Sequence, residues 1–177
     1  MNTKYIIPVL ALTFLLAAGF IWSYDKAPIQ GKETVPDLTD SPLPSELIDE
    51  KGNPVNLSDF HGKIVFINNW ASWCPPCVAE MSTIEKLKNT FPSNDIAFVM
   101  VSFDQDPTKG VKWMKNKKID LPVYFPAEKF PQDLLTDAIP STFILDREGN
   151  LLFTQVGMAD YSKESFITQM TNWIKKN

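Results

Sequence analysis

The only two cysteines of the 177-residue chain lie three positions apart, at Cys74 and Cys77. An apolar run typical of a buried strand precedes them and a helical pattern follows, so Cys74 falls at the amino terminus of a helix. Unpaired N–H groups and the helix dipole stabilise an anion there, and the thiolate is the reactive form of cysteine. Cys77 lies about one turn further along, beside Cys74. The spacing allows a disulfide within the pair, and it allows Cys77 to attack a mixed disulfide that Cys74 has formed.

The residues around the cysteines are compatible with this arrangement. Pro75 and Pro76 fall in the first helical turn, which has no N–H bonds to lose. Trp73 is placed to shield the thiols and to contact a partner, whereas Trp70 is expected to pack in the core. The alternatives are half of a zinc site or an accidental cysteine pair. With His61 as its single histidine, the chain lacks the usual Cys₄ and Cys₂His₂ sets. We therefore expect no metal ion and no cofactor, and a surface-loop position for His61.

Composition excludes several classes of protein. The net charge is −4 and the sequence pI is about 5.0, which argues against nucleic-acid binding because that requires a basic patch. An apolar content of 44% argues against a disordered chain. The length suits one ordinary domain and a short additional segment, and such a domain buries a sizeable core without disulfide staples.

The amino-terminal segment does not read as part of the folded domain. Residues 5–22 are an apolar run without charge, preceded by Lys4. The run reaches the length of a short transmembrane helix, so residues 1–24 are predicted to be a membrane anchor, with a cleaved signal peptide as the alternative. Lys4 places that end in the cytoplasm, so the rest of the chain is predicted to lie outside the cell membrane as a single-pass protein. Residues 25–43 are expected to be a linker and residues 44–177 the domain.

Residues 44–177 show the patterns of alternating strands and helices. Continuous apolar runs predict buried strands, helical spacing predicts helices, and Gly-Asn pairs predict hairpin turns. The strands are predicted at residues 63–70, 96–101 and 121–125, and the hairpins at 46–57 and 141–156. Helices are predicted at 75–89, from Asp106-Pro107 onward, and as a short element at 131–136. A last helix is predicted after Ser162 as its cap, with one face formed by Phe166, Met170, Trp173 and Ile174. Buried strands that alternate with helices favour an α/β fold with a largely parallel sheet, to which the last hairpin adds antiparallel strands.

The sequence resembles the thioredoxin superfamily, and within it the TlpA-like or ResA-like membrane-anchored thiol-disulfide oxidoreductases. The resemblance rests on Asn-Asn-Trp-Ala-Ser-Trp-Cys-Pro-Pro-Cys at residues 68–77 and on Ile-Pro-Ser-Thr-Phe-Ile-Leu-Asp-Arg-Glu-Gly at residues 139–149. Residues 57–63 and the hairpin before them also match. The resemblance implies a thioredoxin-like fold: a central mixed β-sheet flanked by helices on both faces, with an amino-terminal β-hairpin extension.

The resemblance also implies roles for residues outside the cysteine pair. Pro140 is expected to be the cis-proline of this superfamily, with Ile139 and Pro140 next to the reactive disulfide and offering backbone groups to a substrate chain. Glu80 follows Cys77 by three positions and matches a partly buried carboxylate of ResA-like proteins, where it can exchange protons with the thiols. The alternative interpretation is that Glu80 is an ordinary solvated residue on the helix surface. Asn68 stands where thioredoxins keep a buried aspartate.

The implied activity is the reduction of disulfides in exported proteins, in which Cys74 attacks and Cys77 resolves. A membrane thiol transporter is the expected electron donor. Cytochrome c maturation is one role of related proteins, but those usually carry a Gly-rich stretch before the cis-proline and a Glu after it. This chain has residues 136–139 without glycine and then Ser141, so the general reductase pattern fits better. The same chemistry in the reverse direction would make the protein a thiol oxidase. Two weaker alternatives are a thiol peroxidase and a copper-delivery module.

Overall fold

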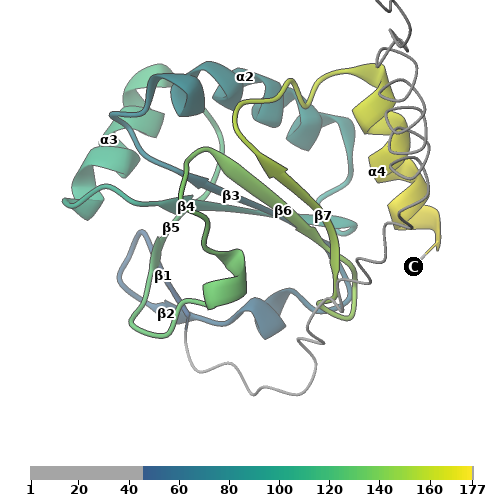
Figure 1. Cartoon of the computed structure of the whole chain (residues 1–177), viewed down its shortest axis with the longest axis horizontal. Coiled ribbons are helices and arrows are strands. Elements are labelled where there is room, and N and C mark those ends of the chain that lie inside the picture. Colours follow the sequence, from purple (N-terminus) through teal and green to yellow (C-terminus); the bar gives the residue numbers. More distant parts are fainter. Residues whose placement is uncertain (1–45, 177) are drawn as a thin grey trace, which may run out of the picture. The chain divides into compact units, whose positions relative to one another are not determined.

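The computed structural model describes residues 46–176, which form a seven-stranded mixed sheet with three α-helices. The strand order is β2-β1-β5-β4-β3-β6-β7 (Figure 1). The strands are β1 (Leu47–Asp49), β2 (Pro54–Val55), β3 (Ile64–Trp70), β4 (Ile96–Ser102), β5 (Val123–Pro126), β6 (Ser141–Leu145) and β7 (Leu151–Val156). The helices are α2 (Pro75–Thr90), α3 (Pro107–Lys117) and α4 (Glu164–Lys176). The predicted thioredoxin-like fold is confirmed. The largely parallel sheet favoured by the alternation of strands and helices was wrong, because four of the six described strand pairings are antiparallel.

The two central strands, β3 and β4, are buried along their whole length. They pair in parallel from Ile64 opposite Ile96 to Trp70 opposite Ser102. Their side chains alternate between two apolar clusters, one on each face of the sheet. A strand that is buried on both faces needs apolar residues at nearly every position, and this is the continuous run from which both strands were predicted.

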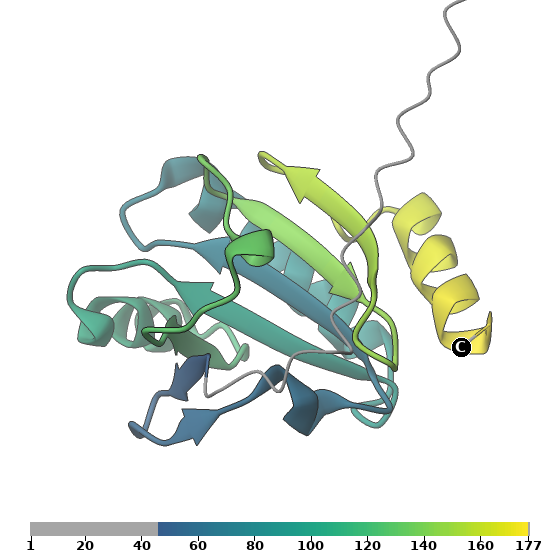
Figure 2. The same cartoon turned by 60° about the horizontal axis from the view of Figure 1, so that its bottom comes forward.

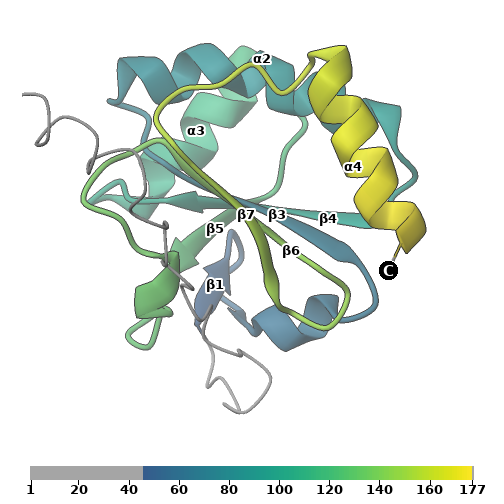
Figure 3. The ribbon, with the colours of Figure 1, turned by 45° about the vertical axis from the view of Figure 1, so that its right-hand side comes forward.

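All three α-helices cover one face of the sheet (Figure 3). The connections β3-α2-β4 and β4-α3-β5 move in the same direction along the sheet, and right-handed crossovers of that kind place both helices on one side. Met81 and Ile84 of α2, Met114 of α3 and Met170 of α4 are buried in the same apolar cluster. Met170 lies on the face of α4 that the sequence predicted.

The opposite face is covered by two short 3-10 helices, Leu57–Phe60 and Gln132–Leu134 (Figure 2). Leu57 and Leu134 are buried in the second apolar cluster. Strand β1 pairs antiparallel with β2 and also with β5, so the predicted hairpin extension becomes one edge of the sheet. The sheet thus has helices on both faces, but α-helices on one face only.

Two local predictions differ from the structure. The short helix predicted at 131–136 is a single 3-10 turn at Gln132–Leu134. The predicted cap of the last helix was wrong, because α4 begins at Glu164 and the Ser162 hydroxyl donates to Asp160 Oδ1 at 2.7 Å. An N-cap residue directly precedes the first helical residue, and its side chain accepts a backbone N–H of the first turn. Here Lys163 directly precedes Glu164, and Ser162 belongs to a turn closed by the Asp160 carboxylate.

The predicted anchor (1–24) and linker (25–43) lie outside the described residues. Between residues 46 and 176, no helix is both long enough and apolar enough to cross a membrane.

Candidate redox-active site

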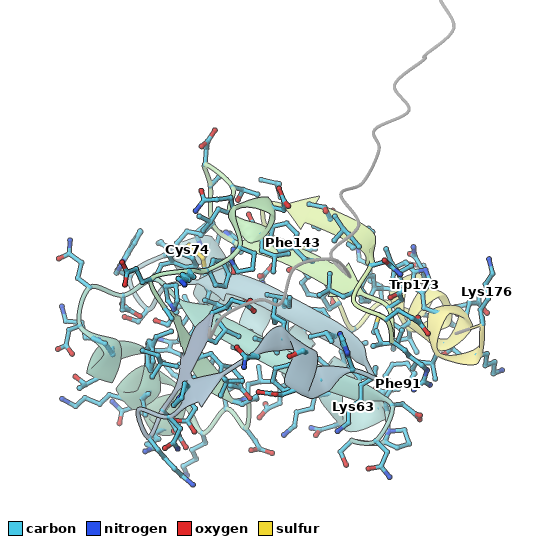
Figure 4. The ribbon with its side chains drawn as sticks, turned by 90° about the horizontal axis from the view of Figure 1, so that it is seen from below. Lys63, Cys74, Phe91, Phe143, Trp173 and Lys176 are labelled. Atoms are coloured by element: carbon cyan, nitrogen blue, oxygen red, sulfur yellow. A yellow bond between two sulfur atoms is a disulfide. The ribbon has the colours of Figure 1, made fainter. Side chains whose placement is uncertain are left out.

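Cys74 and Cys77 form a disulfide at the amino terminus of α2, with their Cα atoms 5.3 Å apart (Figure 4). Cys74 is the N-cap residue, and its Sγ accepts a hydrogen bond from the Cys77 backbone N–H at 3.3 Å. Cys74 is 4% exposed and Cys77 is fully buried. The predicted position of the pair at a helix amino terminus is confirmed, with the sulfur of Cys74 next to an N–H group that has no partner within the helix.

The chain reaches this position through a tight turn after β3. The Cys74 N–H donates to the Ala71 carbonyl oxygen at 3.1 Å and closes the turn, and the Val78 N–H donates to the Cys74 carbonyl oxygen at 3.1 Å as the helix begins. Pro75 and Pro76 occupy the first two helical positions, and both are exposed. Neither proline removes a hydrogen bond that the helix would otherwise form.

A second loop, far along the chain, packs against the disulfide. The Ile139–Pro140 peptide bond is cis, as the resemblance implied. The Ile139 carbonyl oxygen lies 3.8 Å from Cys74 Sγ, although the two residues are 65 positions apart in sequence. Strand β6 starts directly after this loop and pairs antiparallel with β3, with Ser141 opposite Asn69. The pairing of β3 with β6 therefore brings the two loops together.

The carboxyl group of Glu80 is buried on α2, one turn after Cys77, with the side chain 1% exposed. Its Oε1 accepts from Asn68 Nδ2 at 2.8 Å and its Oε2 accepts from the Ala159 N–H at 3.0 Å. Burial raises the pKa of Glu80 to about 7, although both hydrogen bonds act in the opposite direction. The solvated alternative is thereby excluded.

Glu80 belongs to a buried polar network that the sequence did not indicate. Asn68 Nδ2 also donates to Thr142 Oγ1 at 2.9 Å, and the Tyr161 hydroxyl donates to the same oxygen at 2.6 Å. Burial raises the pKa of Tyr161 well above its usual range, and the nearby Glu80 adds to this effect. Thr142 falls in the stretch that carries the family resemblance, but nothing there indicates its partners, and Tyr161 lies in a loop without a recognisable motif. Only the fold therefore reveals this network.

Exposed apolar side chains occur close to the disulfide. Trp73 is 65% exposed, whereas Trp70 is fully buried and packs edge-on against Trp113, as expected for a core residue. Val156 and Met158 are 51% and 58% exposed, and they flank a glycine whose N–H donates to the Pro140 carbonyl oxygen at 2.8 Å. Exposed apolar groups at a site commonly mark a surface that contacts another protein. The sequence indicated Trp73 but not Val156 or Met158.

The site has the groups needed for exchange between a dithiol and a disulfide. Within residues 46–176 no cluster of three or more His, Cys, Asp or Glu side chains could hold a metal ion. His61 lies on the surface, as expected. A pair of sulfurs at a helix amino terminus, a buried carboxyl group with a pKa near 7 and an apolar rim are sufficient to transfer two electrons between sulfur pairs.

Comparison with known proteins gives the same class of chemistry. The chain is 28% identical to thiol-disulfide oxidoreductase ResA of Bacillus subtilis (strain 168), over 93% of this chain and 89% of that protein. It is 26% identical to thiol:disulfide interchange protein DsbE of Tatumella citrea, over 89% of this chain and 87% of that protein. Its fold matches the crystal structure of a candidate DsbE from Chlorobium tepidum with a TM-score of 0.64 and 26% identity, covering 73% of this chain and 92% of that one.

The match to a family spans most of the chain. Residues 30–169 match the Redoxin family, a range that includes the cysteine pair, Glu80 and the cis-proline loop. The relatives named above are thiol-disulfide oxidoreductases and thiol:disulfide interchange proteins. This protein therefore belongs to the Redoxin family and is a thiol-disulfide oxidoreductase of the ResA/DsbE type.

Proposed function

We propose that the protein reduces disulfides of other proteins. In the reduced enzyme, the Cys74 thiolate attacks one sulfur of a client disulfide, and the other client sulfur leaves and takes up a proton. Cys77 then loses its proton and attacks Cys74, which forms the intramolecular disulfide and releases the second client sulfur. The client gains two electrons and two protons, and the enzyme ends in the disulfide state that the structure holds.

The observation that supports this proposal most strongly is the position of Cys74. Its sulfur caps α2, which favours the thiolate, and it lies next to exposed Trp73 and to the Ile139 carbonyl oxygen. A client chain that lies along the loop of Ile139 and Pro140 would therefore bring its own sulfur to Cys74. Cys77 is fully buried one turn deeper, which suits a resolving residue.

Glu80 is assigned the exchange of a proton with Cys77. It lies on the same side of α2, it is buried, and burial raises its pKa to about 7. A group with that pKa can take a proton from a thiol and return it without a large energetic penalty in either direction.

The direction of electron flow is tested by the equilibrium of the Cys74–Cys77 couple with glutathione. A reduction potential near or below about −250 mV, in the range of thioredoxin, supports a reductase. A potential near about −120 mV, that of a strong oxidant, would identify an oxidase instead.

The order of attack is tested by trapping. A Cys77→Ser variant should accumulate a mixed disulfide with a reducible protein such as insulin, because the resolving sulfur is absent. The matched Cys74→Ser variant should accumulate none. A Cys77→Ser variant that traps nothing, together with a wild type that leaves insulin soluble and unreduced, would contradict the proposal.

The proposed location is the outer side of the cell membrane, with residues 1–24 as the anchor, exported proteins as clients and a membrane thiol transporter as the donor. The support is the uncharged apolar run at residues 5–22. In a bacterial host, the full chain should remain in the membrane fraction after an alkaline wash, at its full mass, and should be degraded by protease added to spheroplasts. A soluble chain of full mass, protected inside the cell, would contradict this location.

A further inference from the structure

Asp104 is a buried carboxylate that the proposed chemistry does not use. It lies two residues after β4 and is 7% exposed. Its Oδ1 accepts from the Ser72 hydroxyl at 2.7 Å, and its Oδ2 accepts from the Ser72 backbone N–H at 3.0 Å and from the Ser102 hydroxyl at 2.8 Å. Hydrogen bonds to an ionised acceptor are about twice as strong as neutral ones. The carboxylate therefore ties Ser72, two positions before Cys74, to the end of the neighbouring strand.

The tied segment is the turn that presents the reactive cysteine. The turn runs from Ala71 to Cys74 and is closed by the Cys74 N–H. The Ser72 N–H donates outside the turn, to Asp104. A second link lies beside it, because the Phe103 N–H donates to the Trp70 carbonyl oxygen at 2.8 Å. The loop after β4 thus holds both the start and the middle of this turn.

Helix α3 packs against Asp104 and limits its movement. Gly110 of α3 packs so closely that a Cβ atom at this position would lie 2.7 Å from Ser102 Oγ and 3.2 Å from Asp104 Oδ2. Glycine is therefore required for the helix to approach this far. With Ser72 on one side and Gly110 on the other, the carboxylate cannot move without breaking hydrogen bonds.

We propose that Asp104 is a positioning residue, which holds the Ser72 turn so that Cys74 Sγ stays within bonding reach of Cys77. This inference rests on the proposed function. In the reduced enzyme, the tendency to form the disulfide depends on how often the two sulfurs meet. A loosened turn lowers their effective concentration, because Cys74 samples more positions. The protein dithiol reacts with oxidised glutathione to give the protein disulfide and two molecules of reduced glutathione. When the turn is loosened, this equilibrium lies further toward the protein dithiol and oxidised glutathione.

The test is the equilibrium constant of the full-length protein with glutathione, measured for wild type, Asp104→Asn and Asp106→Asn. Asparagine keeps the shape but presents an N–H₂ group to donors of Ser72 or Ser102. We expect the Asp104→Asn constant to shift about tenfold toward the dithiol, the equivalent of about 1.4 kcal/mol. Asp106→Asn is the matched control, since Asp106 is in the same loop but its carboxylate accepts from Thr108 at the start of α3 and not from the Ser72 turn. Its constant should stay within about twofold of wild type, a change below about 0.5 kcal/mol.

Asp104→Asn changes both the hydrogen bonds to the turn and the charge near Cys74, whereas Ser72→Ala changes only a hydrogen bond. Ser72→Ala also decides the test if Asp104→Asn does not fold. It removes the hydroxyl bond and leaves the carboxylate in place, so a shift in the same direction must come from the loosened turn. Unchanged constants in Asp104→Asn and Ser72→Ala, or equal shifts in Asp104→Asn and Asp106→Asn, would overturn the inference. A wild-type protein that exchanges with glutathione but reduces no client protein would instead contradict the proposed function and leave this comparison valid.

Discussion

Among single residues, Glu80 is a buried carboxyl group one turn after Cys77 whose charged form is disfavoured by burial. The side chain is 1% exposed, and among the described residues two N–H donors compensate its charge, those of Asn68 and Ala159. Desolvation therefore exceeds the stabilisation by hydrogen bonds, and the pKa rises to about 7. Proteins retain such groups at functional sites, where a proton has to move at neutral pH.

Replacement of Glu80 by glutamine should change the pH dependence of thiol exchange. In wild type, the rate should respond to a group that titrates near pH 7, and Glu80→Gln should lose this response while the fold persists. The measurement is the second-order rate constant of client reduction between pH 5 and pH 9. Glu46→Gln is the control: Glu46 is also buried with a pKa raised to about 7, but it bonds the Leu57 N–H on the other face of the sheet. Identical profiles in wild type and Glu80→Gln would return Glu80 to a structural role.

Replacement of Trp73 by alanine should separate client contact from stability. The indole is 65% exposed, so the free energy of unfolding should change by no more than about 0.5 kcal/mol. Reduction of a protein client should fall by about tenfold, because an exposed tryptophan at an interface commonly contributes more than about 1 kcal/mol. The comparison variant is Ile48→Ala, an exposed apolar residue on β1, for which the rate should remain at the wild-type value. Equal rates in both variants would show that Trp73 does not touch the client.

At the scale of secondary-structure elements, the two hairpins use the same turn chemistry. Residues 49–53 and 146–150 share the spacing Asp-x-x-Gly-Asn, and the glycine takes a φ of +87° in the first turn and +93° in the second. In both turns the aspartate accepts from two backbone N–H groups and from the asparagine amide, at 2.8 to 3.0 Å. The Gly-Asn pairs predicted the turns, but the aspartate as common acceptor became evident only with the hydrogen bonds in place.

The two turns should differ in how much their aspartates contribute to stability. Asp146 is 8% exposed and joins β6 to β7, so Asp146→Ala should lower the free energy of unfolding by about 1–3 kcal/mol. Asp49→Ala should cost less, because its partners are exposed and water replaces the lost bonds. Denaturant unfolding of the two variants, compared with wild type, measures both losses. A larger loss in Asp49→Ala would contradict this assignment.

At the scale of the whole molecule, two buried carboxyl groups with raised pKa values lie on opposite sides of the sheet, Glu80 under α2 and Glu46 at the hairpin. Each has its pKa raised from 4.5 to about 7 by burial. Between pH 4.5 and about pH 7, each of these carboxyl groups has lost its proton in the unfolded chain but keeps it in the folded chain. The unfolded state then binds fewer protons, so stability falls as the pH rises from about 4.5 to about 7.

This linkage predicts a protein that is more stable in mild acid than at pH 8. Between pH 4.5 and pH 7, Glu80 alone should contribute a loss of about 3 kcal/mol, and Glu80→Gln should remove that share. Glu46→Gln should remove its own share independently, since the two groups lie on opposite sides of the sheet. The urea midpoint as a function of pH measures both shares. A wild-type midpoint that rises steadily from pH 5 to pH 8 would contradict the prediction.

The sequence by itself determined what depends on near neighbours along the chain. The spacing of Cys74 and Cys77 at a strand-to-helix junction, the buried strands and the two hairpin turns all follow from local patterns, and the structure confirms them. The cis-proline and the burial of Glu80 followed from the family resemblance, not from spacing. The cap at Ser162 was wrong, because the Asp160 carboxylate holds Ser162 in a turn that ends before the helix begins at Glu164.

Only the tertiary structure decided which distant residues meet. The links of Asp104 to Ser72, of Thr142 to Tyr161 and of Glu80 to Ala159 join segments between 19 and 79 positions apart. A buried polar side chain and an exposed one of the same type look alike in the sequence. Their pKa and their partners depend on desolvation and on strand order, which are set when the sheet assembles.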